Sequence, residues 1–263
     1  MNRAVAAPSE AFQQPMPFTR STAGAAGWRW RIPLQHRVGN GHVYCSAFIS
    51  DDDAEADLLA NLDTPLAGSP RRLRFVTGRR RLSWHKNVVA LGLASGFVEP
   101  LESTSIHLVQ RGIATLMSLF PARGFVQAET DLYNRLMAAE YEAVRDFVIL
   151  HYKQTQRDDT PFWRQVREMP VPDSLASRME IFANLGRTIL EPGELFRETS
   201  WVAVMLGQGL WPKGHDPQAD AIPEGEIRDT LRRMKMIVRN GAGALLSHSD
   251  FLARQRAQGE IVK

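Results

Sequence analysis

The sequence contains a single cysteine, Cys45, among its 263 residues. An intrachain disulfide is therefore excluded, and a reducing compartment such as the cytoplasm is the expected location. No uninterrupted apolar stretch approaches the roughly 20 residues that a membrane-spanning helix needs. Residues 1–12 also lack the apolar core of a secretory signal. We therefore expect a cytoplasmic protein with no membrane partner.

Neither sign of charge dominates, since the formal net charge is +3. This excess is too small to imply a nucleic-acid partner, and we expect none. The one basic cluster is the segment 71–81, RRLRFVTGRRR, in which apolar and charged residues alternate. That alternation predicts a strand with a solvated edge, and a phosphate-binding surface is the alternative. A nucleic-acid-binding function would rest on this cluster alone.

A complete G-x-G-x-x-G dinucleotide fingerprint is absent as well. The partial match at Gly241-Ala242-Gly243 follows a predicted helix rather than a strand, and Leu246 occupies the third glycine position. The seven histidines show no metal-ligand spacing, so no metal site is expected. The sequence SHSD at residues 247–250 is interpreted as a helix cap, because the members of a catalytic triad converge from separate elements.

The chain does contain one segment that suggests a site, residues 88–107 with the sequence VVALGLASGFVEPLESTSIH. Its apolar start, residues 88–91, predicts a short buried strand, and the small residues from Gly92 to Gly96 allow close approach of a backbone or ligand. A polar turn then leads into a predicted helix over residues 106–120. Such a helix start favours an anion. Glu102 is therefore interpreted as a helix-capping carboxylate, which the residues alone favour, or as a catalytic group.

The segments before this site are predicted to be a linker followed by a hairpin and a helix. Residues 1–27 have few apolar residues and no clear period, which is typical of a disordered head or linker. Residues 28–34 alternate as a half-buried strand does. The sequence Gly39-Asn40-Gly41 predicts the hairpin turn, with residues 43–50 returning antiparallel. Residues 51–62 predict a helix with an acidic start.

The C-terminal half is predicted to be helical, with apolar stripes that we assign to the core. Asp173 is predicted to cap one helix, and Pro223 to lie in the first turn of another. Residues 201–211, WVAVMLGQGLW, form either one wall of an indole-type pocket or a buried helix and turn. The predicted stripes are Ile106, Val109, Ile113, Leu116, Met117 and Phe120; Leu132, Leu136, Ala139, Ala143, Phe147 and Leu150; Leu175, Met179, Phe182 and Leu185; and Ile227, Leu231, Met234 and Val238.

Two segments resemble the signatures of the flavin-dependent tryptophan-halogenase family. GWRWRIP matches its W-x-W-x-I-P motif through Trp28, Trp30, Ile32 and Pro33, and residues 86–108 resemble its second signature. The resemblance is strong over residues 19–120, weaker over the helical remainder, and confined to the C-terminal part of the longer family members. A fragment of a flavin monooxygenase, which should lack GWRWRIP, is the alternative enzyme. A non-catalytic remnant or binding module is the alternative outside enzymes.

The resemblance implies an enzyme that chlorinates or brominates a tryptophan or indole-type aromatic substrate. In the family, a separate flavin reductase supplies reduced FAD, which yields a flavin hydroperoxide, and bound halide then gives a hypohalous acid. By resemblance, Glu102 is the catalytic glutamate and Thr104 and Ser105 bind halide. Ser105 stands where tryptophan-specific members usually have glycine, so free tryptophan need not be the substrate. The residues matching the flavin-contacting element are Gly92, Ala94, Gly96 and Ser103.

The family motif itself has two interpretations. In the family, W-x-W-x-I-P is thought to keep the substrate away from the flavin, but Trp28 and Trp30 are equally suitable as core residues. Family enzymes bind FAD through an N-terminal Rossmann-type unit and carry their catalytic lysine in the same half. Neither feature has a counterpart here, and Lys86 is not that lysine.

We therefore expect an α+β fold in two parts. Residues 1–105 would be a mixed-sheet remnant of an α/β FAD- and halide-binding domain. Residues 106–263 would form a helical domain that contributes to the substrate pocket. We expect the chain to be inactive alone, and we favour a truncated gene model, with Met1 an internal methionine, over a broken halogenase. A homodimer is left open.

Overall fold

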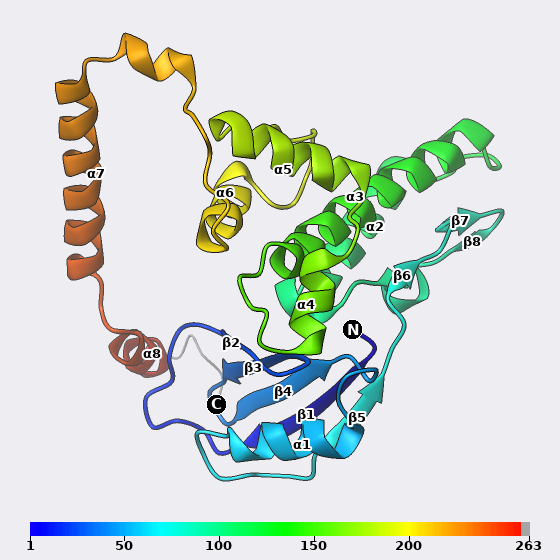
Figure 1. Ribbon diagram of the computed structural model, residues 1–263. Coiled ribbons are helices and arrows are strands. Elements are labelled where there is room, and N and C mark those ends of the chain that lie inside the picture. The colour runs from blue at the N-terminus through cyan, green and yellow to red at the C-terminus, as the bar shows by residue number, and fades with distance from the viewer. Residues whose placement is uncertain (259–263) are drawn as a thin grey trace.

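The computed structural model describes residues 1–258, and its fold is α+β as expected. Five strands form one sheet in the order β2-β3-β4-β1-β5, and every neighbouring pair is antiparallel. Helix α1 lies against one face of this sheet, and the larger group of helices lies on the other (Figure 1). The strands are β1 (Arg3–Ser9), β2 (Arg20–Ala23), β3 (Gly27–Pro33), β4 (Val38–Tyr44) and β5 (Arg71–Arg74).

The expectation of a disordered head or linker over residues 1–27 is wrong. β1 lies in the interior of the sheet, hydrogen-bonded to β4 on one side and β5 on the other, and β2 pairs with β3. Val5 is fully buried and Ala7 nearly so, packed with Tyr44 and Leu58 in the core between the sheet and α1. The backbone hydrogen bonds on both sides of β1 hold a segment whose small side chains give little hydrophobic signal.

The strand predicted over residues 28–34 is confirmed as β3, but the predicted hairpin turn is wrong. The chain reverses between Leu34 and Arg37, whose N–H and C=O groups are 2.9 Å apart as donor and acceptor. Gly39-Asn40-Gly41 lies inside β4, which ends at Tyr44 instead of running from residue 43 to 50. Gly41 pairs with Trp30, and a Cβ atom at residue 41 would lie 1.9 Å from the indole ring. The glycine therefore accommodates the tryptophan instead of making the turn.

The elements that follow β4 are close to prediction. Helix α1 (Asp51–Ala60) begins with three aspartates, and the Ser50 side chain accepts the N–H of Asp53 at 3.1 Å. β5 is an edge strand whose four residues are all exposed, as the basic segment 71–81 predicts. Two small two-stranded sheets follow. β6 (Gly78–Arg79) pairs with β9 (Gly96–Phe97), and between them in the chain β7 (Trp84–His85) and β8 (Val88–Val89) form a hairpin.

The buried strand predicted over residues 88–91 is wrong. Only Val88 and Val89 form a strand, and Val88 is 63% exposed. The hairpin turns at Lys86, which has a positive φ of 54°, and its short partner strand provides no sheet to cover the valines. Trp84 is the residue that enters the core, where its ring contacts Tyr133 edge-on at 5.5 Å.

Helix α3 lies at the centre of the helical layer and takes part in each of its three apolar clusters. One of these clusters joins the helix to the sheet, since Val148 and Tyr152 pack with Trp28 and Val43. The helical elements in chain order are η1 (Gly92–Ala94), η2 (Pro100–Glu102), α2 (Ser105–Ser118), α3 (Gln127–Lys153), α4 (Pro161–Glu168), α5 (Asp173–Leu185), α6 (Glu198–Gly207), η3 (Pro217–Ala221), α7 (Glu224–Ala244) and α8 (His248–Ala257).

The predicted helices exist, but several predicted core stripes are wrong. On α2 the buried residues are Leu108, Gly112 and Thr115, while Ile106 and Met117 are each 73% exposed. Gly112 is buried because its carbonyl accepts the Tyr133 hydroxyl of α3 at 3.4 Å, which requires a close approach of the two helices. Helix α7 has no buried residue, and Leu231, Met234 and Val238 of its predicted stripe are exposed. In Figure 1 this helix stands apart from α2 to α6.

The helix ends are partly as expected. Ser247 caps α8 by accepting the N–H of Asp250 at 3.1 Å, which confirms the interpretation of SHSD. Asp173 is the first helical residue of α5 instead of its cap, and Pro172 occupies the cap position. Pro223 occupies the cap position of α7 instead of lying in the first turn. On α5 Leu175 and Phe182 are buried.

Neither a membrane helix nor a metal centre is found in residues 1–258. None of the helices there combines the length and the apolar character needed to cross a bilayer. The same residues contain no group of three histidine, cysteine or acidic side chains that could hold a metal ion.

Gly27→Ala is expected to destabilise the sheet where β3 meets β4. The added Cβ atom would lie 1.9 Å from the backbone oxygen of Val43, which cannot move without breaking the ladder. We expect a loss of about 2–3 kcal/mol in the free energy of unfolding, measured by urea denaturation. Gly241→Ala is the control, because it lies on α7 with no atom within 4 Å, and it should stabilise the chain by about 0.5–1 kcal/mol. Equal effects of the two substitutions would contradict the packing described for β3.

Candidate functional site

The candidate site is the turn that runs from η1 to the start of α2. Gly92 has a φ of +60°, which favours glycine over any residue with a Cβ atom. Gly96 of β9 pairs with Arg79 of β6, and a Cβ atom at residue 96 would lie 2.7 Å from the Gly78 oxygen. Ala94 is exposed on η1, and its carbonyl oxygen accepts the Nε–H of Arg80. The small residues therefore allow a tight turn that is hydrogen-bonded to the neighbouring basic residues Arg79 and Arg80.

A buried carboxyl group, Glu99, connects this turn to the sheet and to α3. Glu99 is 5% exposed, and its Oε2 atom accepts the Tyr152 hydroxyl at 2.7 Å and the Trp28 indole N–H at 3.5 Å. Burial raises the pKa of Glu99, although hydrogen bonds from Tyr152 and Trp28 act in the opposite direction. Trp28 belongs to the W-x-W-x-I-P motif, so Glu99 links the two signatures that the sequence analysis singles out.

Glu102 does not cap a helix, so the capping interpretation favoured by the residues alone is wrong. It is the last residue of η2, and the cap position of α2 is taken by Thr104. The Glu102 side chain extends instead to α3, where its Oε1 atom lies 2.9 Å from Nε2 of His151. Both side chains are partly buried, with 29% of Glu102 and 17% of His151 exposed.

The hydrogen positions in the Glu102–His151 pair follow from a second hydrogen bond of His151. His151 Nδ1 lies 2.8 Å from the backbone oxygen of Phe147, which can only accept, so Nδ1 carries a hydrogen. The short contact from Nε2 to Glu102 then requires one proton between these two atoms. Either the histidine is an imidazolium facing a carboxylate, or the carboxyl group is protonated and donates to Nε2. The contact with His151 holds the Glu102 carboxyl group against α3.

The helix start beside Glu102 provides backbone N–H groups. Ser103 adopts the left-handed conformation with φ 53° and ψ 35°, which turns the chain sharply before Thr104 and Ser105. Thr104 is 4% exposed, whereas Ser105 is exposed as the first residue of the 14-residue helix α2. N–H groups in the first turn of a helix lack intrahelical partners and attract anions. The predicted halide residues therefore lie together, on the chain segment that follows Glu102 directly.

The four predicted motif residues lie along β3 with different surroundings. Trp28 is 5% exposed and packs with Val148, Tyr152 and Phe162, so it is a core residue. Trp30 is only half-buried, at 6.0 Å between ring centroids from Trp28. The remaining motif residues, Ile32 and Pro33, are half-buried at the end of the strand.

The segment predicted as a pocket wall or a buried helix divides between two environments. Trp201 is 1% exposed on α6, where its ring lies under the guanidinium of Arg178 at 4.1 Å and meets Phe147 edge-on. Trp211 follows the helix and is 70% exposed. Burial of Trp201 agrees with the helix interpretation for the first half of the segment.

Three residues of the site were missed by the sequence analysis: Glu99, Tyr152 and His151. Glu99 lies in the turn that contains Glu102, but nothing in the local sequence marks it as a buried residue. His151 and Tyr152 are adjacent on α3, far away in sequence, and nothing in their spacing points to the turn. The only available signal was a paired histidine and tyrosine within an otherwise apolar helical stretch, which is too weak for an assignment.

Comparison with known proteins shows the family to which the chain belongs. The tryptophan halogenase family model matches residues 1–224. A 7-chloro-L-tryptophan 6-halogenase from Kutzneria sp. (strain 744) is 33% identical over 245 residues, which are 92% of this chain and 48% of the relative. A tryptophan 7-halogenase from Lentzea aerocolonigenes is 31% identical over 262 residues, covering 92% and 49% of the two chains.

A solved structure gives the same result in three dimensions. The flavin-dependent halogenase from Xanthomonas campestris superposes with a TM-score of 0.93 at 47% identity, over 96% of this chain and 51% of that one. The chain therefore belongs to the tryptophan halogenase family. It spans about half the length of the curated relatives that it matches.

The buried carboxyl group makes a prediction about pH. Because burial raises the pKa of Glu99 above its ordinary value of 4.5, the folded chain binds a proton that the unfolded chain has lost. Stability should therefore fall as the pH rises above 4.5, by up to about 1.4 kcal/mol per pH unit from this group. Glu99→Gln is neutral at every pH and should not show this fall.

The measurement is the difference in free energy of unfolding between wild type and Glu99→Gln, from urea denaturation at several pH values between 4 and 8. Taking the difference cancels the other titrating groups that the two chains share. The variant should gain on the wild type as the pH rises. A difference that does not change with pH would show that Glu99 titrates normally.

Proposed function

We propose that this chain is the C-terminal part of a reduced-FAD-dependent halogenase that chlorinates or brominates a tryptophan or indole-type aromatic substrate. The observation that carries the proposal is the junction of the two family signatures. Trp28 of the first signature and Glu99 of the second are bonded to one another, and three residues beyond Glu99 the carboxyl of Glu102 contacts His151. Family membership supports the same conclusion.

In this proposal Glu102 is the catalytic carboxylate. Halogenation of an aromatic ring releases a ring proton, so a positioned base near the ring assists the reaction. The contact with His151 holds the Glu102 side chain and offers a second group that can share the proton. The N–H groups of Thr104 and Ser105 at the start of α2 would hold the halide ion, as a helix start favours an anion.

The η1 turn is compatible with one wall of a flavin site. Leu93 and Ala94 are exposed, so the backbone between Gly92 and Gly96 is accessible. The positive φ at residue 92 favours glycine, which has no side chain to cover this backbone. Gly96 is already required by the close pairing of β6 with β9, so its contact with flavin would be through backbone atoms. We assign Gly92, Ala94, Gly96 and Ser103 to contacts with FAD. When bound, reduced flavin would supply the electrons that activate dioxygen.

Two further parts of the proposal concern the chain as a whole. A separate flavin reductase would supply the reduced FAD by diffusion. Residues 1–105 would belong to the FAD- and halide-binding domain, and residues 106–263 would form the helical domain beside the substrate. Because the chain spans about half of its relatives and contains no dinucleotide fingerprint, we propose that it does not halogenate by itself.

Glu102→Gln tests the catalytic assignment. The activity is measured in a chimera that joins this chain to the half of the Xanthomonas halogenase that it does not match, with an indole and tryptophan panel. The amide keeps the size of the side chain but cannot act as a base. Halogenated product per reduced FAD consumed should fall by about 100-fold or more, which is the scale of a lost acid–base group.

Glu142→Gln is the matched control, because Glu142 is a surface carboxylate of α3 paired with Arg79. It should leave turnover within a few-fold of the parent chimera. The melting temperatures of both variants should stay near that of the parent, since neither residue is in the core. A Glu102→Gln chimera as active as the Glu142→Gln chimera would overturn the assignment. Product formed by this chain without a fusion partner would contradict the proposal that it is inactive alone.

A further inference from the structure

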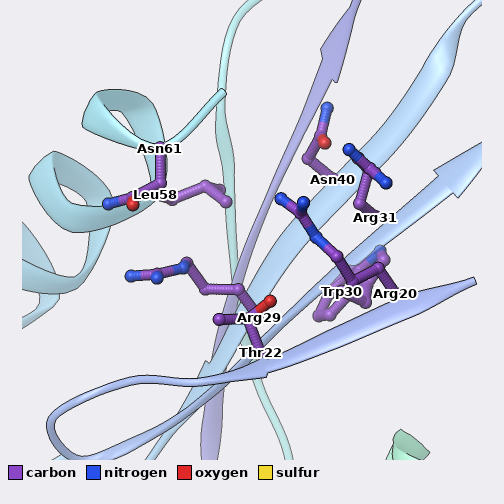
Figure 2. Close-up of a pocket in the computed structure, with 8 residues that line it drawn as sticks. All are labelled: Arg20, Thr22, Arg29, Trp30, Arg31, Asn40, Leu58 and Asn61. Atoms are coloured by element: carbon purple, nitrogen blue, oxygen red, sulfur yellow. The ribbon is translucent and has the colours of Figure 1, made fainter. Parts of the chain in front are cut away.

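A second, separate site lies on the opposite face of the sheet, beside α1. Three arginines line a cavity there: Arg20 of β2 and Arg29 and Arg31 of β3 (Figure 2). The strand register explains their grouping. Arg20 pairs with Arg31 and Thr22 pairs with Arg29, and side chains of directly paired residues project on the same face of a sheet. Helix α1 contributes Leu58 and Asn61 to the other wall of the cavity.

The cavity is larger than an ordinary packing defect. Its volume is about 260 Å³, which is room for several water molecules. A single halide ion would not fill it, whereas a phosphate or carboxylate group on a small organic molecule would. Leu58 gives part of the lining an apolar character suited to the organic portion of such a ligand, whereas Trp30 contributes backbone, because its ring packs beside Trp28 on the other face of the sheet.

The charges around the cavity do not balance. Asp63 pairs with Arg31 and lies 3.4 Å from Arg20, while Asp57 lies 2.6 Å from Arg29. His42 of β4 lies 3.2 Å from Asp57. Burial lowers the pKa of this histidine, so it is neutral at pH 7. Three guanidinium groups therefore face two carboxylates, and one positive charge is left over.

Arg31 provides the most specific indication of a ligand. It is 8% exposed, and its Nε–H group is buried without a hydrogen-bond acceptor among residues 1–258. A buried donor without a partner costs about 1–3 kcal/mol, more for a charged group, so an oxygen ligand that reached it after a small local rearrangement would be favoured. The guanidinium is also held in place, because Nη1 is bonded to Asp63 and the Phe12 ring lies 5.3 Å away.

We propose that this cavity binds a small organic oxyanion through Arg31, Arg20 and Arg29, with the hydroxyl of Thr22 as a further hydrogen-bonding group. A guanidinium can donate two parallel hydrogen bonds to a phosphate or a carboxylate, and a preformed group of arginines selects such ligands over monatomic anions. The site is independent of the proposed halogenation chemistry, because neither Glu102 nor the η1 turn contributes to it. The competing explanation is that the arginines only bind Asp57 and Asp63 and so fasten α1 to the sheet.

The test is calorimetric titration of the full chain with sodium phosphate and, separately, with benzoate, against sodium chloride at the same ionic strength. We expect saturable binding of at least one of the two oxyanions, with a Kd of about 1 mM or tighter, and no saturable heat with chloride. Phosphate binding alone would identify a phosphate ester as the ligand class. Benzoate binding alone would identify a carboxylate.

Two variants connect the binding to the cavity. Arg20→Gln removes a half-exposed arginine and should weaken binding about 5-fold or more. Arg72→Gln removes the same charge from an exposed residue paired with Asp52 and Glu55 outside the cavity, and should change the Kd less than 2-fold. The Nε–H resonance of Arg31, assigned through Arg31→Lys, should shift during the titration of the wild type.

Three results would overturn the proposal. The first is the absence of saturable binding by both oxyanions, and the second is an equal loss of affinity in Arg20→Gln and Arg72→Gln. The third is binding that leaves the Arg31 Nε–H resonance unchanged. Loss of product formation by the Glu102→Gln chimera has no bearing on any of these, so the two proposals fail separately.

Discussion

The arrangement of the site depends on one carboxyl group that has been removed from water. Glu99 accepts hydrogen bonds from Trp28 in the sheet and Tyr152 in α3, and it lies in the turn that contains Glu102. A buried carboxyl is costly without such partners, so the three residues stabilise one another only when the sheet, the turn and the helix are assembled. The position of Glu102 opposite His151 follows from this assembly, because His151 precedes Tyr152 on the same helix.

Helix α3 joins the sheet to the other helices through its packing contacts. Its residues Val148 and Tyr152 pack on the sheet, Tyr133 and Met137 pack on the β7–β8 hairpin and α2, and Phe147 packs on α6. The helix therefore contains buried residues around most of its circumference, which explains the buried polar groups Asn134 and Glu140 on it. Asn134 bonds both backbone groups of Trp84 at 2.8 Å, so it serves as a fixed support for the hairpin.

The sequence predicted the local structure of the segments that carry the candidate site better than it predicted the fold around them. The motif strand β3, the turn at Gly92 to Gly96 and the helix start at Ser105 were all found from local composition, because each depends on a few neighbouring residues. The interior strand β1 was missed, since its stability comes from hydrogen bonds to β4 and β5 and not from its own side chains. The stripe on α2 was assigned largely to the wrong face, because Leu108, Gly112 and Thr115 are the buried residues, while Ile106 and Met117 are exposed. Glu99 and His151 could not be placed from sequence, because their partners are distant in the chain.

The central claim is that Glu99 fastens the turn of Glu102 to α3, and a double-mutant cycle measures this bond directly. The free energy of unfolding is determined for the wild type, Glu99→Met, Tyr152→Phe and the double variant by urea denaturation. If the 2.7 Å hydrogen bond holds the elements together, the two substitutions should be coupled by about 1 kcal/mol or more. Tyr133→Phe, whose hydroxyl bonds the distant Gly112, is the control and should add to Glu99→Met without coupling. Effects of Glu99→Met and Tyr152→Phe that add to within about 0.3 kcal/mol would contradict the claim.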